Sequence, residues 1–169
     1  FEATIDFLED HGYFQYEISS FARIGKSGQP HVSRHNLKYW TLAPYIGLGA
    51  SAHSFNRTQR YWNVSDVDEY IAAIETGRLP VAEREVLSRE QQIIETIYLG
   101  LRMTAGIDLT GFEAKFGINF VERFKDVISD FEQQNYLEVK NDRCALTRQA
   151  RAFLDSIASI FITRDLFDS

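Results

Sequence analysis

The alternation of apolar and polar positions predicts a helix at the start of the chain. Phe1, Ile5 and Leu8 recur at helical spacing, and the pattern stops before Gly12, a residue suited to the left-handed position just past a helix. Residues 13–19 are then typical of a strand.

A glycine-containing turn leads from this strand to a short helix expected over 34–40. The apolar run over 45–52 predicts a second, buried strand. Helix, strand, loop, helix and strand follow one another as in α/β architectures.

From Ser65 the pattern becomes mainly helical. Ser65 and Asp68 are expected to cap a helix that ends at Gly77. Residues 78–86 are expected to be a linker. The apolar face of this helix consists of Val67, Tyr70, Ile71 and Ile74.

Three helices are expected to begin after the linker, because a capping residue precedes a Gln or Glu by three positions in each case. The second of these helices should stop at Gly117. The pairs are Ser88 with Gln91, Thr110 with Glu113, and Asn119 with Glu122.

Strand-like residues 136–140 and 144–146 flank an Asn141-Asp142 turn and predict a hairpin. Thr147 is expected to cap a last helix. We therefore predict an α+β fold that ends in a mostly helical, winged-helix-like region with a small hairpin. The apolar face of the last helix carries Phe153, Leu154, Ile157, Ile160 and Phe161.

Composition limits the class of protein. The chain has 169 residues and 44% hydrophobic residues, which is enough for a packed core. It has no apolar run of about 18 residues and no secretory signal pattern, so we expect a soluble, cytoplasmic protein. It opens inside a helix without Met, which suggests a piece of a longer protein. The single cysteine, Cys144, forms no internal disulfide and holds no metal cluster by itself.

Charge is distributed unevenly along the chain. The net charge is −6, yet the window 18–65 contains no Asp or Glu. Residues 81–169 instead carry 15 acids against 11 bases, which argues against nucleic-acid binding by the winged-helix-like region. The window favours an anionic ligand. Its basic residues are Arg23, Lys26, Arg34, Lys38, Arg57 and Arg60.

His35, Tyr39 and Trp40 lie within this acid-free window. A histidine can ligate haem iron, flat aromatic rings pack on a macrocycle, and basic side chains meet its propionates. The alternative interpretation is a short packed helix with a hydrogen-bonded structural histidine. Residue types alone leave both interpretations open.

The segment from Gly47 to His53 is rich in small residues, so its backbone can approach a ligand closely at a strand end. Close helix packing would need the same small residues, and this alternative stays open. Glu17 is a conceivable acid–base group, but no paired carboxylates and no Ser/His/Asp order indicate a catalytic site.

Several segments together resemble the oxygen-independent coproporphyrinogen III oxidase-like radical SAM family. They occur in the family's order along nearly the whole chain, which makes the match more specific than any single motif. They are Tyr16–Ala22 (YEISSFA), Arg34–Trp40 (RHNLKYW), Tyr45–Phe55 (YIGLGASAHSF) and Leu99–Arg102 (LGLR).

Within that family, the HNxxYW pattern is similar to the haem-chaperone branch. The resemblance implies that haem is bound, with His35 as the candidate iron ligand and with Asn36, Tyr39 and Trp40 shaping the site. Arg34 and Lys38 are the propionate candidates. A haem-accepting protein and an electron donor are the implied partners.

The family's reaction uses S-adenosylmethionine and a [4Fe–4S] cluster held by a CxxxCxxC motif, which this sequence lacks. The resemblance implies that the motif lies upstream, in a partial (β/α) barrel whose last helix and strands are residues 1–56. Residues 57–86 would be a helix and linker, and 87–169 the C-terminal domain. The S-adenosylmethionine-proximal candidates are Gly47, Gly49, Ser51 and His53.

Ala50 and Ser51 depart from the usual GxGPGAHS form of the family. Haem binding and delivery is the first functional hypothesis, and this fragment is expected to be inactive as an enzyme. The alternative is an oxidase that decarboxylates the propionates of coproporphyrinogen III. A third hypothesis makes 81–169 an interaction module.

Overall fold

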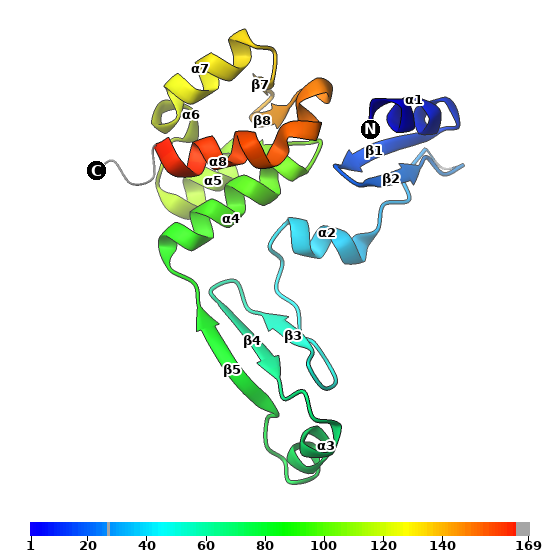
Figure 1. Cartoon of the computed structure of the whole chain (residues 1–169), viewed down its shortest axis with the longest axis vertical. Helices are drawn as coiled ribbons and strands as arrows, with labels where there is room; N and C mark the ends of the chain where they lie inside the picture. Colours follow the sequence, from blue (N-terminus) through cyan, green and yellow to red (C-terminus); the bar gives the residue numbers. More distant parts are fainter. Residues whose placement is uncertain (27, 165–169) are drawn as a thin grey trace. The chain divides into compact units, whose positions relative to one another are not determined.

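The computed structural model describes residues 1–26 and 28–164, and the chain forms two compact units. The first combines residues 1–41 with the chain from residue 93 onward, and the second is formed by residues 42–92. Figure 1 shows the elements of each unit. These units do not follow the boundaries expected at 56 and 86. The assignment of 1–56 to a barrel and of 87–169 to a separate domain stays a prediction.

The first unit begins with helix α1 (Glu2–Asp10), which ends before Gly12 as predicted, with that glycine at φ +78°. Strand β1 (Tyr13–Glu17) follows, but the strand expected to reach Ser19 is wrong at its end. The chain turns back after Glu17 into β2 (Ser20–Arg23), antiparallel to β1. No Gly, Asn or Pro marks this turn, so the pattern did not indicate the hairpin.

Helix α2 (Arg34–Trp40) has the predicted bounds. The Oγ of Ser33 accepts a hydrogen bond from the backbone N of Asn36 at 3.3 Å, which caps the helix. None of its residues is buried. The helix is therefore a surface element with no face in a core.

Helix α4 (Arg89–Arg102) begins with the predicted capping box. The backbone N of Gln91 donates to Ser88 Oγ at 3.1 Å, and the backbone N of Ser88 donates to Gln91 Oε1 at 2.7 Å.

Helix α5 (Leu109–Phe116) is capped by Asp108 and not by Thr110, because the Asp108 carboxylate accepts from the backbone N of Gly111 at 3.0 Å. It ends at Gly117, at φ +63°, as predicted.

Asn119 caps the next helix as predicted, by accepting from the backbone N of Glu122 at 3.0 Å. That helix is interrupted at Phe124, which divides it into α6 (Phe120–Arg123) and α7 (Lys125–Gln133).

The predicted hairpin is confirmed as β7 (Leu137–Lys140) and β8 (Arg143–Leu146). Asn141 and Asp142 form its turn at φ +52° and +62°. Strand β6 (Ile107–Asp108), which the sequence did not indicate, pairs with β8 and gives the order β6-β8-β7.

Thr147 makes no side-chain cap, and a 3₁₀ helix η1 (Arg148–Phe153) precedes the last helix α8 (Leu154–Arg164). The Thr147 hydroxyl instead donates to the carbonyl of Asn135 at 2.7 Å. Phe153, expected in the core, is 52% exposed. Ile160 is partly buried, and Leu154, Ile157 and Phe161 are buried.

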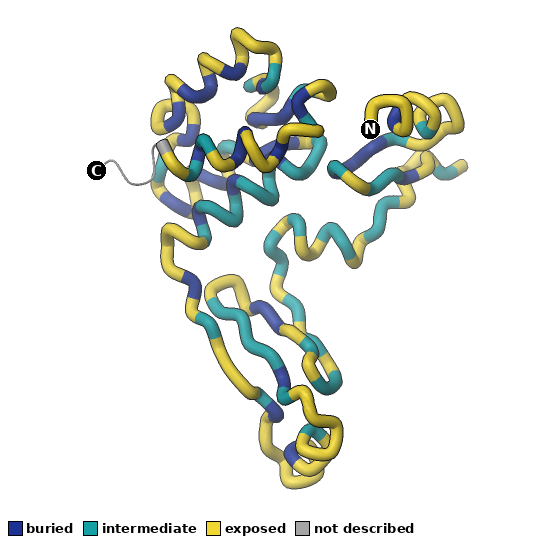
Figure 2. The backbone as a smooth tube through the Cα atoms, viewed as in Figure 1, coloured by how far each residue is buried: buried dark blue, intermediate teal, exposed yellow. Residues whose placement is uncertain are grey.

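One apolar core unites the helices from α4 to α8 with the hairpin, and Figure 2 shows its buried positions along their backbones. Phe120 lies at its centre, with ring centroids 5.0 Å from Phe112, 4.7 Å from Phe124 and 5.8 Å from Phe161. Gly100 lets α4 approach β6 closely, because an added Cβ would lie 2.6 Å from Ile107.

The second unit is a three-stranded antiparallel sheet in the order β3-β4-β5, with helix α3 (Val67–Glu75) between β4 and β5. Its strands are β3 (His53–Phe55), β4 (Gln59–Asn63) and β5 (Val81–Val86). The linker expected over 78–86 is wrong, because β5 pairs with β4 along its length.

Two further expectations for this unit are wrong. The buried strand over 45–52 is absent, since that segment forms an isolated bridge, Tyr45 with Phe55, and Leu48 is 85% exposed. Asp66 caps α3 in place of Ser65 by accepting from the backbone N of Glu69 at 2.8 Å. Among the apolar residues expected to be covered, Val67, Ile71 and Ile74 are exposed.

Truncation of Phe120 should destabilise the first unit. Phe120 is 1% exposed, so Phe120→Ala leaves a cavity in the aromatic cluster and should cost about 3–5 kcal/mol of unfolding free energy. Val121→Ala is the control, because Val121 is 37% exposed and should change stability by less than about 0.5 kcal/mol. Urea unfolding followed by circular dichroism measures both, and equal losses would contradict this core.

Candidate functional site

Helix α2 presents two rows of candidate site side chains on its exposed face. Arg34 and Lys38 are four residues apart, as are His35 and Tyr39, so each pair lies along one side of the helix. All four residues are exposed. The helix thus displays two cations beside an imidazole and a phenol.

The structure brings His35 and Tyr39 together. Tyr39 Oη lies 3.3 Å from His35 Nε2, and the two rings meet edge to face with centroids 5.2 Å apart. The imidazole is thereby held against the phenol, and which of the two atoms donates depends on the histidine tautomer.

The opposite side of α2 is anchored through Trp40. The Arg102 guanidinium carbon lies 4.2 Å from the centre of the Trp40 ring, within the range of a cation–π interaction. Trp40 Nε1 is buried without a hydrogen-bond partner in the described part of the chain. Asn36, predicted as a site residue, shares this half-buried side of the helix with Trp40.

Arg102 also neutralises Glu17, which is 1% exposed at the end of β1. Arg102 Nη2 lies 2.8 Å from Glu17 Oε2. The two atoms are in charge contact without the alignment of a hydrogen bond, and Glu17 Oε2 has no other partner among the described residues. A buried carboxylate is stable only with a compensating charge, so Arg102 is required where Glu17 is buried.

Backbone contacts join β1 to the end of α4 at the same place. The backbone N of Ile18 donates to the Arg102 carbonyl at 3.2 Å, and the backbone N of Thr104 donates to the Tyr16 carbonyl at 3.2 Å. Sequence reasoning missed Arg102 as a site residue. The available signal was the cation at the end of the LGLR segment, whose other three residues are leucine or glycine.

The S-adenosylmethionine-proximal candidates lie in the second unit. Gly47 donates its backbone N–H to Ser54 Oγ at 3.0 Å, and Gly49 donates to Tyr70 Oη at 3.1 Å. Ser51 is exposed at φ +59° in the same loop. The segment is a loop before β3 and not the strand end that was predicted.

Asn63 holds this loop in place. It is 7% exposed, and its side-chain amide donates to the carbonyls of Gly49 at 2.8 Å and of Gly47 at 3.4 Å. His53, the first residue of β3, is exposed and stacks on Trp62 with ring centroids 5.5 Å apart.

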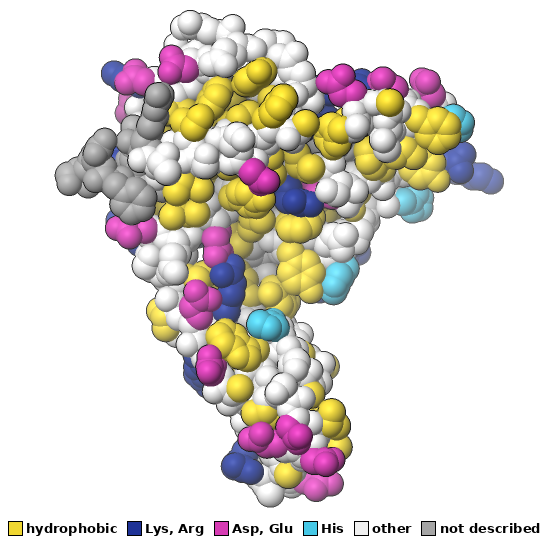
Figure 3. Space-filling view, in the orientation of Figure 1, with side chains coloured by type: hydrophobic (Ala, Val, Ile, Leu, Met, Phe, Trp, Pro, Cys, Tyr) yellow, Lys and Arg dark blue, Asp and Glu magenta, His cyan; other side chains and the backbone are white. Residues whose placement is uncertain are grey.

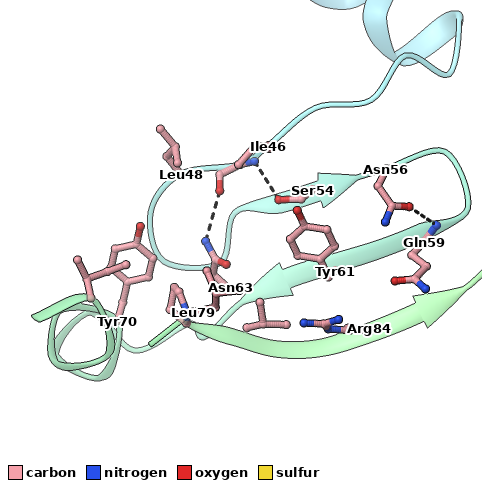
Figure 4. Close-up of a pocket in the computed structure, with 14 residues that line it drawn as sticks. Ile46, Leu48, Ser54, Asn56, Gln59, Tyr61, Asn63, Tyr70, Leu79 and Arg84 are labelled. Carbon is pink, nitrogen blue, oxygen red and sulfur yellow. Dashed lines mark hydrogen bonds between the residues drawn. The ribbon is translucent and has the colours of Figure 1, made fainter. Parts of the chain in front are cut away.

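A cavity of about 400 Å³ lies between the loop, the sheet and α3 (Figure 4). Of the four predicted residues only Gly47 lines it. Figure 4 shows Tyr61 and Arg84 of the sheet on one side and Leu48 on the loop. The apolar part of the lining consists of Ile46, Leu48, Ile74, Leu79, Pro80 and Val81.

Acidic side chains gather over α3 at one end of the second unit (Figure 3). Asp66, Asp68, Glu69 and Glu75 belong to this helix or its cap. They follow directly after the acid-free window over 18–65.

Neither a metal cluster nor a membrane span is formed by the described residues. In residues 1–26 and 28–164, no three His, Cys, Asp or Glu side chains group to hold a metal ion. Within the same ranges, no helix is long and apolar enough to cross a bilayer. Cys144 is fully buried.

Similarity to known proteins defines the class: the chain is a C-terminal portion of a HemN/HemW-like protein. Residues 87–153 match the HemN C-terminal domain family. This match begins at the loop before α4 and includes Arg102.

Relatives extend the similarity over nearly the whole chain. It is 33% identical over 162 residues to the heme chaperone HemW of Bacillus subtilis, covering 96% of this chain and 41% of that protein. It is 31% identical over 166 residues to the heme chaperone HemW of Lactococcus lactis, covering 98% and 42%. The chain therefore spans about two fifths of the length of these relatives.

A solved structure shares the fold. Coproporphyrinogen III oxidase (HemN) from Escherichia coli, a radical SAM enzyme, superposes with a TM-score of 0.64 and 16% identity over 96% of this chain and 40% of that chain. At this identity the likeness shows the fold alone.

Cys144 should be unreactive in the folded chain. Burial, with a smaller contribution from the Glu132 carboxylate, raises the pKa of the Cys144 thiol to about 12. At pH 8 only about one thiol in 10⁴ is then ionised, so iodoacetamide should label Cys144 far more slowly than in the urea-unfolded chain. Mass spectrometry measures both rates, and equal rates would show that the thiol is accessible.

Removal of the Asn63 side chain should loosen the loop over 45–52. Asn63→Ala removes the side-chain donor to both carbonyls, of which only that of Gly49 keeps a bond to a described residue, from the backbone N of Ala52 at 3.3 Å, and should cost about 1–3 kcal/mol of unfolding free energy. Glu83→Ala, an exposed change on β5, is the control and should lie within about 0.5 kcal/mol of the parent. Hydrogen exchange of the Gly47 and Gly49 amides should rise only in Asn63→Ala. Unchanged protection would contradict the anchoring role.

Proposed function

We propose that the chain is the haem-contacting, C-terminal portion of a haem-binding and haem-delivering protein of the radical SAM coproporphyrinogen III oxidase-like family. One observation carries the proposal: α2 displays His35, Tyr39, Arg34 and Lys38 together on its exposed face. The two relatives described above are heme chaperones, which supports the same function.

The residues of α2 fit haem in their chemistry. Iron in haem takes a neutral imidazole nitrogen as an axial ligand, and His35 offers one at the surface. When the Nε2–H of His35 donates to Tyr39 Oη, Nδ1 keeps its lone pair for iron. Arg34 and Lys38 are placed to meet the propionates, and neither forms an ion pair with another described residue.

We assign the rest of the chain from its resemblance to the family. The order α4, β6, α5, α6, α7, β7, β8 with the sheet order β6-β8-β7 supports a winged-helix-like region. Residues 1–56 would close the partial barrel of the whole protein. The [4Fe–4S] cluster and S-adenosylmethionine would belong to that barrel, with Gly47, Gly49, Ser51 and His53 on the cofactor side. A haem-accepting protein and an electron donor would be the partners of the whole protein.

Haem titration tests this function. Addition of haem should shift the Soret band of the chain, and His35→Ala should lose the shift and bind at least about tenfold more weakly, because the iron loses its nitrogen ligand. His11→Ala is the control, since His11 is exposed at the end of α1, outside the acid-free window. Its spectrum should equal that of the parent.

The spectra also separate the proposal from the oxidase alternative, in which the same cations bind substrate carboxylates. An unshifted Soret band in the parent, or equal spectra for the parent and His35→Ala, would contradict haem ligation by His35.

A further inference from the structure

Each end of α2 is held by a contact. The helix has seven residues, none of them buried, and a helix of this length is not stable without tertiary support. Its N-terminus is held by the local Ser33 cap. Its last residue, Trp40, is held by stacking on Arg102. Trp40 is therefore a tertiary anchor of the helix and helps to set the direction in which its exposed face points.

Arg102 is itself held in place by contacts that do not involve Trp40. Its backbone carbonyl accepts from Ile18, and its guanidinium lies 2.8 Å from the buried carboxylate of Glu17 and 3.4 Å from Ser19 Oγ. The side chain is 19% exposed. A planar cation restrained in this way forms a rigid platform for an aromatic ring.

The contact is the shortest cation–π distance among the described residues, at 4.2 Å against 4.8–6.0 Å for the others. Trp40 Nε1 gains no hydrogen bond from a described residue. The Trp40 ring is therefore held by the contact of its face with Arg102 and not by a hydrogen bond from its Nε1–H to a described residue.

We propose that Arg102, held by Glu17, is a positioning residue for the haem-contacting face of α2. It stacks on Trp40 and so fixes the direction of His35 and Tyr39 without touching haem. This inference rests on the haem-binding function proposed above and adds a residue from a segment 62 positions beyond Trp40 in the sequence.

Arg102→Lys tests the role because lysine keeps the charge opposite Glu17 but lacks the planar face. The parent for the test carries Trp62→Phe, so that Trp40 is the remaining tryptophan. Acrylamide quenching of Trp40 fluorescence without haem should rise in Arg102→Lys. The haem dissociation constant should rise roughly tenfold, while the Soret maximum at saturation stays the same because His35 is retained.

Arg143→Lys is the matched control. It makes the same exchange in the same unit at an exposed pair, in which Arg143 lies 3.7 Å from Asp108. Quenching and haem affinity should both equal those of the parent. If Arg102→Lys behaves like this control in either measurement, Arg102 does not position the haem-contacting face.

A second variant keeps the proposal testable if Arg102→Lys does not fold. Glu17→Gln with Arg102→Met removes both charges and leaves neither unpaired, a replacement that proteins often tolerate. It should show the same rise in the dissociation constant with an unchanged circular dichroism spectrum. Parental affinity in this variant would overturn the proposal.

Failure of haem binding and failure of the positioning role of Arg102 give different results. A parent that shows no Soret shift contradicts haem binding itself, and the positioning role for haem falls with it. Increased quenching with unchanged haem affinity in Arg102→Lys contradicts only the positioning role.

Discussion

The charge pair of buried Glu17 and half-buried Arg102 is the interaction on which the arrangement of the site depends. A carboxylate with 1% exposure needs a cation, and the cation comes from the end of α4 at 2.8 Å. The same guanidinium then supports Trp40. Three segments far apart in the sequence thus meet at one side chain, and the short helix α2 acquires a defined direction.

The aromatic core keeps this pair in place. Helix α4, which ends at Arg102, buries Ile93, Ile97 and Leu101 against the cluster centred on Phe120. The backbone of Arg102, whose side chain contacts Trp40, is therefore held by a rigid, closely packed core. Binding side chains on a surface helix need fixed groups behind them, and for the proposed face of α2 that group is an ion pair within the first unit.

Local signals in the sequence predicted the elements that local contacts determine. The caps at Ser88 and Asn119, the Asn141 turn and the bounds of α2 are set by residues within a few positions. Predictions failed where partners are distant. Segment 45–52 was expected to be a strand because of its apolar run, but its polar groups bond to Ser54, Asn63 and Tyr70. Strand β5 looked like a linker because its polar residues gain order only by pairing with β4. The pattern proposed His35 and Tyr39 as candidates but not Arg102, because burial of Glu17 is a tertiary property.

The most direct test of this account is a double-mutant cycle on the haem dissociation constant with Arg102→Lys and Trp40→Leu. If Arg102 acts through the Trp40 ring, the exchange weakens haem binding roughly tenfold when Trp40 is present and has no effect when leucine replaces it. An equal loss in both backgrounds, giving additive changes in binding free energy, would contradict the account.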